Sequence, residues 1–199
     1  MRRLINALVF VTLTLASTNV FSYNSDPKIF INELVNDAIA TLSNKNISIL
    51  EKNKKIATIA SQNVDVKALS MYTLGPIRKN LDQITLKKYQ NLFEKYFLKS
   101  LTSRLTDYSS QKFEVLGAEQ KSEIYTIVNS KIAESSSGPE IKINWRVYTK
   151  DSAKPLIRDL IVEGLSLAKT QKEEFASILN SNNNDINILF FKLEEFVKN

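Results

Sequence analysis

The chain of 199 residues contains neither histidine nor cysteine. Histidine is the commonest general base near neutral pH, and both residue types are preferred ligands of zinc and related metals. Their absence excludes most metal chemistry and all thiol chemistry. Because no disulfide can form, a domain exported from the cell would depend on its core alone, which suits a bacterial periplasm better than a eukaryotic extracellular space.

Glycine is also scarce, with four residues in the chain, and no glycine-rich loop that would cradle a phosphate is present. Residues 163–167, EGLSL, resemble a nucleophile elbow, but the second glycine is missing and no imidazole exists to activate Ser166. We interpret Ser166 as the N-cap of a helix, where its hydroxyl accepts a hydrogen bond from a free backbone amide.

A catalytic pair of carboxylates is not apparent either. Asp159 and Glu163 lie four residues apart on or beside one predicted strand, about 13 Å at about 3.3 Å per residue. The carboxylate pairs of glycosidases are separated by about 5 to 9.5 Å, so this pair does not fit. We interpret Asp159 as a structural hydrogen-bond acceptor near the rim of a sheet, and the chain as a protein that is not an enzyme.

Long hydrophobic runs are absent outside the N-terminus. There, Arg2 and Arg3 precede an apolar run over residues 4–16, which is followed by polar and small residues. The run is shorter than the roughly 20 residues of a membrane-spanning helix. The pattern predicts a secretory signal peptide over residues 1–22 that is cleaved from the mature chain.

The mature chain, residues 23–199, is expected to be one soluble domain in the periplasm of a Gram-negative bacterium. Without the two arginines of the signal, 25 basic residues would face 21 acidic ones, a net charge of about +4. The lysines are scattered along the chain instead of forming one basic face, which argues against binding to nucleic acid.

Apolar residues recur at helical spacing in the first half of the chain and near its end. The longest stripe is rich in aromatic residues, and the short helix before it is closed by Gly75-Pro76. The pattern predicts helices over residues 27–42, 47–61, 65–74, 82–108, 166–179 and 186–197.

Between these helices the period changes to two. In the third of the strands, Ile141, Ile143, Trp145 and Val147 alternate with polar residues, which predicts one dry face and one wet face. Gly164 follows the fourth strand, where it is free to adopt a positive φ as the chain turns into the next helix. The strands are predicted over residues 112–115, 123–132, 141–148 and 156–162.

This order predicts an α+β fold in a single domain. A four-stranded antiparallel meander would be covered on one face by helices. Apolar residues are abundant on both layers, so we expect an apolar pocket between the sheet and the helices.

Two sequence blocks resemble the MlaC family of periplasmic phospholipid-binding proteins, also known as toluene-tolerance auxiliary proteins. One is Ser103-Arg104-Leu105-x-x-Tyr108 at the end of the aromatic-rich helix. The other runs from Asp159 through Val162-Glu163-Gly164-x-Ser166-Leu167 to Gln171, Phe175 and Ala176. The resemblance covers nearly the whole mature chain, including Leu74-Gly75.

The resemblance implies a soluble carrier, without a cofactor, that passes glycerophospholipids between membranes. Its partners would be an outer-membrane lipoprotein complex and an inner-membrane ABC transporter with its own lipid-binding subunit. Such a system maintains the lipid asymmetry of the outer membrane. The carrier itself is expected to be a monomer with phospholipid as its cargo.

Apolar residues of the predicted helices and strands are candidates for contact with the acyl chains. The headgroup would remain near the mouth of the pocket, where Arg78, Lys79 and Arg104 are candidate contacts for a phosphate. The predicted lipid-binding residues are Met71, Leu74, Phe93, Phe97, Leu101, Ile143, Trp145, Val147, Leu160, Val162, Leu165 and Leu167.

Two other functions are compatible with the same composition. In a structural or adaptor protein of the cell envelope, these apolar residues would form an ordinary core, packed at a density of about 0.74 with no room for two tails. In an isomerase or hydratase acting on a hydrophobic substrate, a polar pair would have to lie inside the pocket. The strand faces predicted to point inward offer no such pair.

Overall fold

The computed structural model describes residues 23–105, 112–133 and 139–199. The predicted signal peptide, residues 1–22, lies outside the described residues. The same holds for the expected end of the long helix at Tyr108.

The first two helices begin at caps that the sequence supplies. Asp26 caps α1 (Pro27–Ser43) by accepting hydrogen bonds from two backbone amides of the first turn. Ser48 and Glu51 form a capping box at the start of α2 (Ile49–Asn63). Both predicted helices are confirmed, with α2 starting and ending about two residues later than expected.

The next helices are separated by a glycine-containing turn. The helix α3 (Val66–Leu74) ends at Gly75, whose φ of 66° lies in the region that glycine adopts without strain. A short 3-10 helix, η1 (Gly75–Asn80), then leads to α4 (Gln83–Leu105), the longest helix.

The described strands form one antiparallel sheet in the order of the sequence. Its strands are β1 (Lys112–Ser122), β2 (Tyr125–Ala133), β3 (Glu140–Tyr148), β4 (Leu156–Val162) and β5 (Leu165–Ser166). The predicted α+β class and antiparallel meander are confirmed, with a fifth, two-residue strand added. It forms because Glu163 (φ 49°) and Gly164 (φ 84°) reverse the chain, so that Leu165 pairs with Val162.

The chain ends with two helices, α5 (Leu167–Asn180) and α6 (Ile186–Lys198). Ser166 caps α5 with its hydroxyl oxygen, which accepts a hydrogen bond from the amide of Lys169 at 3.0 Å. The interpretation of Ser166 as an N-cap is therefore confirmed.

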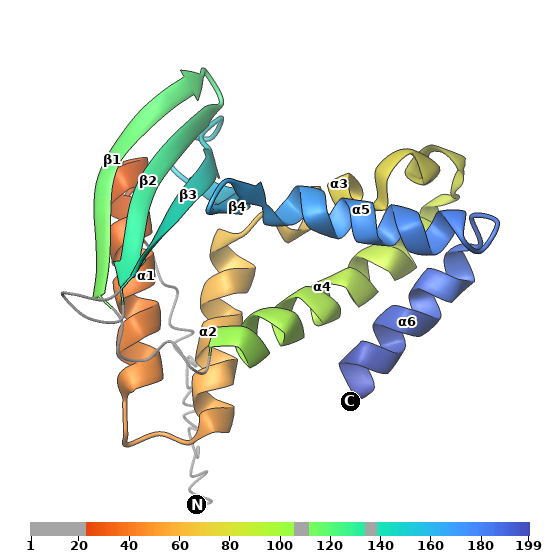
Figure 1. The fold of residues 1–199 in the computed structure, drawn as a ribbon, viewed down its shortest axis with the longest axis horizontal. Coiled ribbons are helices and arrows are strands. Elements are labelled where there is room, and N and C mark those ends of the chain that lie inside the picture. The colour runs from red at the N-terminus through yellow and green to blue at the C-terminus, as the bar shows by residue number, and fades with distance from the viewer. Residues whose placement is uncertain (1–22, 106–111, 134–138) are drawn as a thin grey trace, which may run out of the picture.

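Two separate apolar clusters hold the described structure together, and Figure 1 shows their places in the fold. At one end, the sheet curves around α1, and α2 lies beside α1; at the other end, α3, α4, α5 and α6 pack together. We call the first cluster the sheet core; it comprises Phe30, Ile31, Leu34, Val35, Leu42, Ile56, Ile59, Val128, Val147 and Ile157. We call the second the helical core; it comprises Leu74, Leu86, Tyr89, Phe93, Phe175, Leu179, Leu189, Phe190 and Leu193.

Candidate functional site

The face of the sheet that packs on α1 is the wall on which a lipid pocket was predicted. Residues directly opposite one another on antiparallel strands point to the same face. Trp145 lies opposite Val128 on one side and opposite Leu160 on the other. Since Val128 is fully buried in the sheet core, all three belong to this inner face.

On the inner face, burial falls off along β3 and β4, from the buried pair Val147 and Ile157 toward Ile143 and Val162. On β2 every second residue is buried, whereas the inner-face residues Ile143, Leu160 and Val162 of β3 and β4 are only half-buried. These three side chains belong to neither core. They form an apolar surface that the described residues leave incompletely covered.

One polar group is built into the inner face. The hydroxyl of Ser130 is buried, accepts a hydrogen bond from Trp145 Nε1 at 2.8 Å, and donates one to the carbonyl oxygen of Ile143 at 2.9 Å. Phe113 meets the Trp145 ring edge-on, with 6.2 Å between the ring centroids. These contacts fix the orientation of the indole and satisfy its N–H without water.

The structure distributes the predicted lipid-binding residues over four environments, of which the half-buried inner-face surface of Ile143, Leu160 and Val162 is one. Val147 belongs to the sheet core, and Leu101 and Trp145 pack against it. Leu165 and Leu167 are exposed at 69% and 43% beside the turn between β4 and α5, apart from both cores. The members associated with the helical core are Met71, Leu74, Phe93 and Phe97.

Two pockets formed by the described residues lie away from the inner sheet face. One, of about 300 Å³, is lined by η1 and α5 and shares only Leu74 with the predicted lipid-binding set. The other, of about 310 Å³, is polar and lies between α2 and α4. Neither is lined by Ile143, Leu160 or Val162.

The three residues predicted to contact the headgroup lie in different surroundings. Arg78 Nη1 donates hydrogen bonds to the carbonyl oxygens of Met71 at 3.1 Å and Gly75 at 2.8 Å. It thereby satisfies carbonyls at the end of α3, a structural role. Lys79 and Arg104 are exposed.

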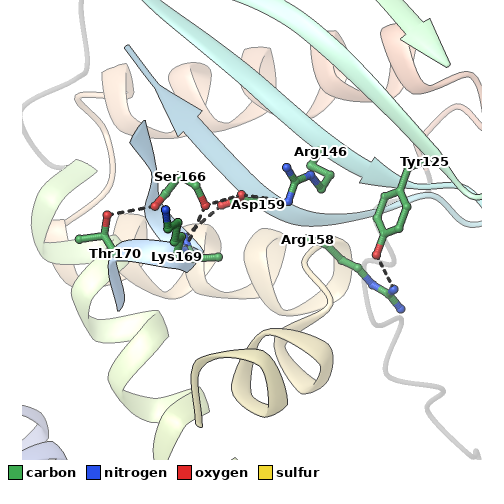
Figure 2. Close-up of polar contacts among 8 residues, drawn as sticks. Tyr125, Arg146, Arg158, Asp159, Ser166, Lys169 and Thr170 are labelled. Atoms are coloured by element: carbon green, nitrogen blue, oxygen red, sulfur yellow. Dashed lines mark hydrogen bonds and ion pairs between the residues drawn. The ribbon is translucent and has the colours of Figure 1, made fainter. Parts of the chain in front are cut away.

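The block from Asp159 to Ala176 forms the junction between the sheet and α5 (Figure 2). Asp159 is 4% exposed, and its carboxylate accepts hydrogen bonds from Ser166 Oγ at 2.7 Å and from the amide of Ala168 at 3.1 Å. Arg146 Nη1 lies 3.5 Å from the same carboxylate. The interpretation of Asp159 as a structural acceptor is confirmed.

The rest of the block also makes structural contacts. Gln171 accepts a hydrogen bond from the hydroxyl of Tyr96 at 2.8 Å. Phe175 is buried in the helical core, edge-on to Phe93 with 6.3 Å between the ring centroids. These residues therefore attach α5 to α4.

Sequence reasoning missed a polar cluster on the other face of the sheet. Arg158 Nη2 lies 2.7 Å from Asp65 Oδ2. Arg158 Nη1 donates a hydrogen bond to the hydroxyl of Tyr125 at 2.9 Å, as Figure 2 shows. The guanidinium also stacks on Tyr148, 3.4 Å from the ring centroid. Strict alternation would place Arg158 on the inner face with Leu160 and Val162, but the register of β4 against β3 shifts between Arg146 and Val147, and Arg158 turns to the other face. No local signal predicts this shift or identifies Asp65 as the partner of Arg158.

Residues 23–105, 112–133 and 139–199 contain no group of three acidic residues arranged to hold a metal ion. No helix within these ranges is long and apolar enough to span a bilayer.

Comparison with family models identifies one family for this chain. A family model described as "MlaC protein" matches residues 32–195. Among solved structures, the chain is similar to a phospholipid-binding protein from Ralstonia solanacearum in complex with a phospholipid. The TM-score is 0.71 at 17% identity, over 88% of this chain and 97% of that one. At this identity the similarity shows the fold, and no curated protein matches the chain. Because the family model spans most of its length, the chain belongs to the MlaC family.

Proposed function

We propose that this protein is a carrier that binds a glycerophospholipid by its acyl chains and moves it between the two membranes of a Gram-negative envelope. The observation that carries the proposal is the half-buried apolar surface of Ile143, Leu160 and Val162 on the inner sheet face. Family membership and the fold shared with a phospholipid-binding protein support it.

The physics of the cargo explains why a protein is needed. Two acyl chains contain about 30 methylenes, and exposing each to water costs about 0.8 kcal/mol, on the order of 20 kcal/mol in total. A lipid that crosses an aqueous compartment must therefore be shielded throughout. The same free-energy cost makes spontaneous release of the lipid into water negligibly slow. Unloading therefore requires docking to a partner that provides a continuous apolar path.

The size of the cargo also constrains how it is loaded. If each methylene occupies about the volume of a water molecule, roughly 30 Å³, the two tails fill roughly 900 Å³. The larger of the two pockets is about 310 Å³. Neither pocket lies on the inner sheet face, so we infer that the half-buried apolar surface of this face opens further when the tails enter.

The cellular setting is part of the proposal. Residues 1–22 would direct export and be removed, leaving a monomer in the periplasm. An outer-membrane lipoprotein complex and an inner-membrane ABC transporter complex would be its partners. The lipid would be cargo, with no cofactor and no catalytic step.

The test uses protein purified from a bacterial host, extracted with organic solvent and analysed by mass spectrometry. We expect phospholipid close to one molecule per chain. Folded protein that is repeatedly recovered empty and cannot be loaded from phospholipid vesicles would refute the proposal.

Neighbouring residues of β4 provide a matched pair of variants. Leu160 lies on the inner face and Ile161 on the outer face, and both are half-buried. Leu160→Asn should reduce the lipid content severalfold, whereas Ile161→Asn should retain it. Equal lipid content in the two variants would place the tails elsewhere.

A further inference from the structure

The first described residues, Tyr23 and Asn24, are attached to α1 and to the sheet core. The ring of Tyr23 packs against the sheet core and meets Phe30 edge-on, with 6.1 Å between the ring centroids. The backbone amide of Asn24 donates a hydrogen bond to Glu33 Oε2 at 2.8 Å. Asn24 Oδ1 accepts one from the amide of Asp26, the N-cap of α1, at 2.9 Å. The chain is therefore held in place before α1 begins.

Two carboxylates of α1 lie near this segment. The hydroxyl of Tyr23 is buried, and its pKa is raised by burial, by the charge of Asp37 and a hydrogen bond to it, and by the charge of Glu33. Glu33 and Asp37 are four residues apart, so they lie on one face of the helix. Within residues 23–105, 112–133 and 139–199, neither carboxylate forms an ion pair with a lysine or an arginine. A positive charge at the start of this segment would therefore be favoured.

The backbone nitrogen of Tyr23 is close to one of these carboxylates. The nitrogen of Asn24 is 2.8 Å from Glu33 Oε2, and one residue spans at most about 3.6 Å. The nitrogen of Tyr23 is therefore within about 6.4 Å of the same oxygen. This upper limit is close to the range of about 4 to 6 Å over which an opposite charge stabilises the charged form of a group.

An ammonium group arises at this nitrogen only if the bond before Tyr23 is cut. Val20 and Ser22 are small enough to occupy the third and the first position before a signal-peptide cleavage site. Hydrolysis breaks the amide bond between Ser22 and Tyr23. Water supplies a hydroxyl group to the carbonyl carbon of Ser22 and a hydrogen to the nitrogen of Tyr23. The new amine has an ordinary pKa of about 7.7 to 8.0, so it binds a further proton at neutral pH.

We propose that a signal peptidase cuts the chain before Tyr23 and that the α-ammonium group formed there pairs with the carboxylate of Glu33. The inference rests on the export that is part of the proposed function. In the uncut chain the same nitrogen belongs to a neutral amide, so the ion pair exists in the mature protein alone. Cleavage therefore adds a charge interaction to the hydrogen bond that already attaches this segment to α1.

The first measurement locates the cut. The full chain is expressed in a bacterial host, and the intact mass of the purified periplasmic protein is determined. We expect the mass of residues 23–199. A mature protein that begins at another residue overturns the inference and leaves export intact. A chain that keeps residues 1–22 contradicts export itself, whereas the carrier function is tested separately by lipid extraction.

The second measurement titrates the new amine. In the exported protein, the pH dependence of the Tyr23 Cα shift is followed by NMR. We expect an α-amino pKa at least about half a pH unit above its ordinary value of about 7.7 to 8.0. Glu33→Gln keeps an oxygen that can accept from the amide of Asn24, but it should return this pKa to the ordinary value. Glu94→Gln, which changes an exposed carboxylate of α4, should titrate like the wild type.

One extra residue provides a test without any substitution in the fold. Protein made in the cytoplasm with a methionine before Tyr23 carries its ammonium one residue farther along the chain from Glu33. We expect its α-amino pKa to be ordinary and its thermal unfolding midpoint to be about 1 to 3 °C lower at pH 7. Equal α-amino pKa values in this protein and the exported one, or in the wild type and Glu33→Gln, would overturn the ion pair.

Discussion

Arg158 forms an ion pair with Asp65, which lies 93 positions earlier in the sequence. The distance between Arg158 Nη2 and Asp65 Oδ2 is 2.7 Å. Both side chains are largely shielded, at 25% and 16% exposed. Asp65 is also the N-cap of α3, where it accepts a hydrogen bond from the amide of Ala68. Because Arg158 belongs to β4, this pair fastens the sheet to the first helix that contributes to the helical core.

Removing the arginine should destabilise the protein. In Arg158→Met, Asp65 loses its charged partner, and the stacking on Tyr148 is lost. We expect the free energy of unfolding to fall by about 2 to 3 kcal/mol, measured by urea denaturation. A double-mutant cycle with Asp65→Asn should give a coupling energy above about 1 kcal/mol.

The exposed pair of Lys169 and Glu173 is the matched control. Its nitrogen and oxygen are 3.7 Å apart, and both side chains are about two-thirds exposed. Lys169→Met should change the free energy of unfolding by less than about 0.5 kcal/mol. Comparable losses in the two variants would show that shielding of the Arg158 pair has no energetic consequence.

Removing the buried carboxylate of Asp159 should lower the stability of the protein more than removing the N-cap hydroxyl of Ser166. Asp159→Ala leaves Ser166 Oγ and the amide of Ala168 without their acceptor, so a loss of about 2 to 4 kcal/mol is expected. Ser166→Ala removes one cap and should cost about 1 kcal/mol. Thermal and urea unfolding of both variants measure which substitution lowers the free energy of unfolding more. A larger decrease for Ser166→Ala than for Asp159→Ala would contradict the prediction.

Alkaline pH should destabilise the protein through Tyr89. The side chain is fully buried, with its hydroxyl 3.0 Å from Thr73 Oγ1, and burial raises the pKa of Tyr89 above its ordinary value of 10.0. Above about pH 10 the unfolded chain loses this proton while the folded chain keeps it. The stabilisation is therefore fully present below pH 10 and is lost as the pH rises toward the folded pKa, by about 1.4 kcal/mol per unit.

Replacing Tyr89 by phenylalanine tests this pH dependence. Tyr89→Phe should be less stable than the wild type near neutral pH, because one hydrogen bond is lost, but its stability should fall less steeply above about pH 10. Burial also raises the pKa of Tyr23 and Tyr96. Part of the decrease in stability with rising pH therefore remains in Tyr89→Phe. Urea unfolding of both proteins at several alkaline pH values measures this pH dependence. If their free energies of unfolding differ by the same amount at every pH, the role of Tyr89 is contradicted.

The fold could be predicted from the sequence because its signals are local. Capping residues such as Asp26 and Ser48 mark helix starts, Gly75 marks a helix end, and alternation marks the strands. The two-residue strand β5 was missed because Leu165 and Ser166 are strand residues only through their pairing with β4. No periodicity exists in so short a segment.

The candidate site was harder to predict, because periodicity identifies an apolar face without identifying what covers it. Leu101 and Phe93 lie on the same helix, yet Leu101 packs against the sheet core and Phe93 belongs to the helical core. Partners far apart in sequence, such as Arg158 and Asp65, have no local signal at all. The membership of the lipid-binding set therefore stays a prediction.

Trp145 offers a direct test of where the tails lie, because it is the only tryptophan in the chain. Its indole lies on the inner face, opposite Leu160, and is fixed by the hydrogen bond to Ser130. Phospholipid with brominated acyl chains should quench Trp145 fluorescence strongly, since bromine quenches on contact, whereas the same lipid without bromine should not.

A tryptophan on the opposite face is the control. In Trp145→Phe/Ile127→Trp, the indole moves to the outer face of β2, because Ile127 lies opposite Arg146. Ser130 keeps its hydrogen bond to the carbonyl oxygen of Ile143, so the inner face should remain folded. Brominated lipid should leave this emission nearly unchanged. Equal quenching on both faces, or none at Trp145 in protein that carries the lipid, would mean that the tails do not lie against the inner face of the sheet.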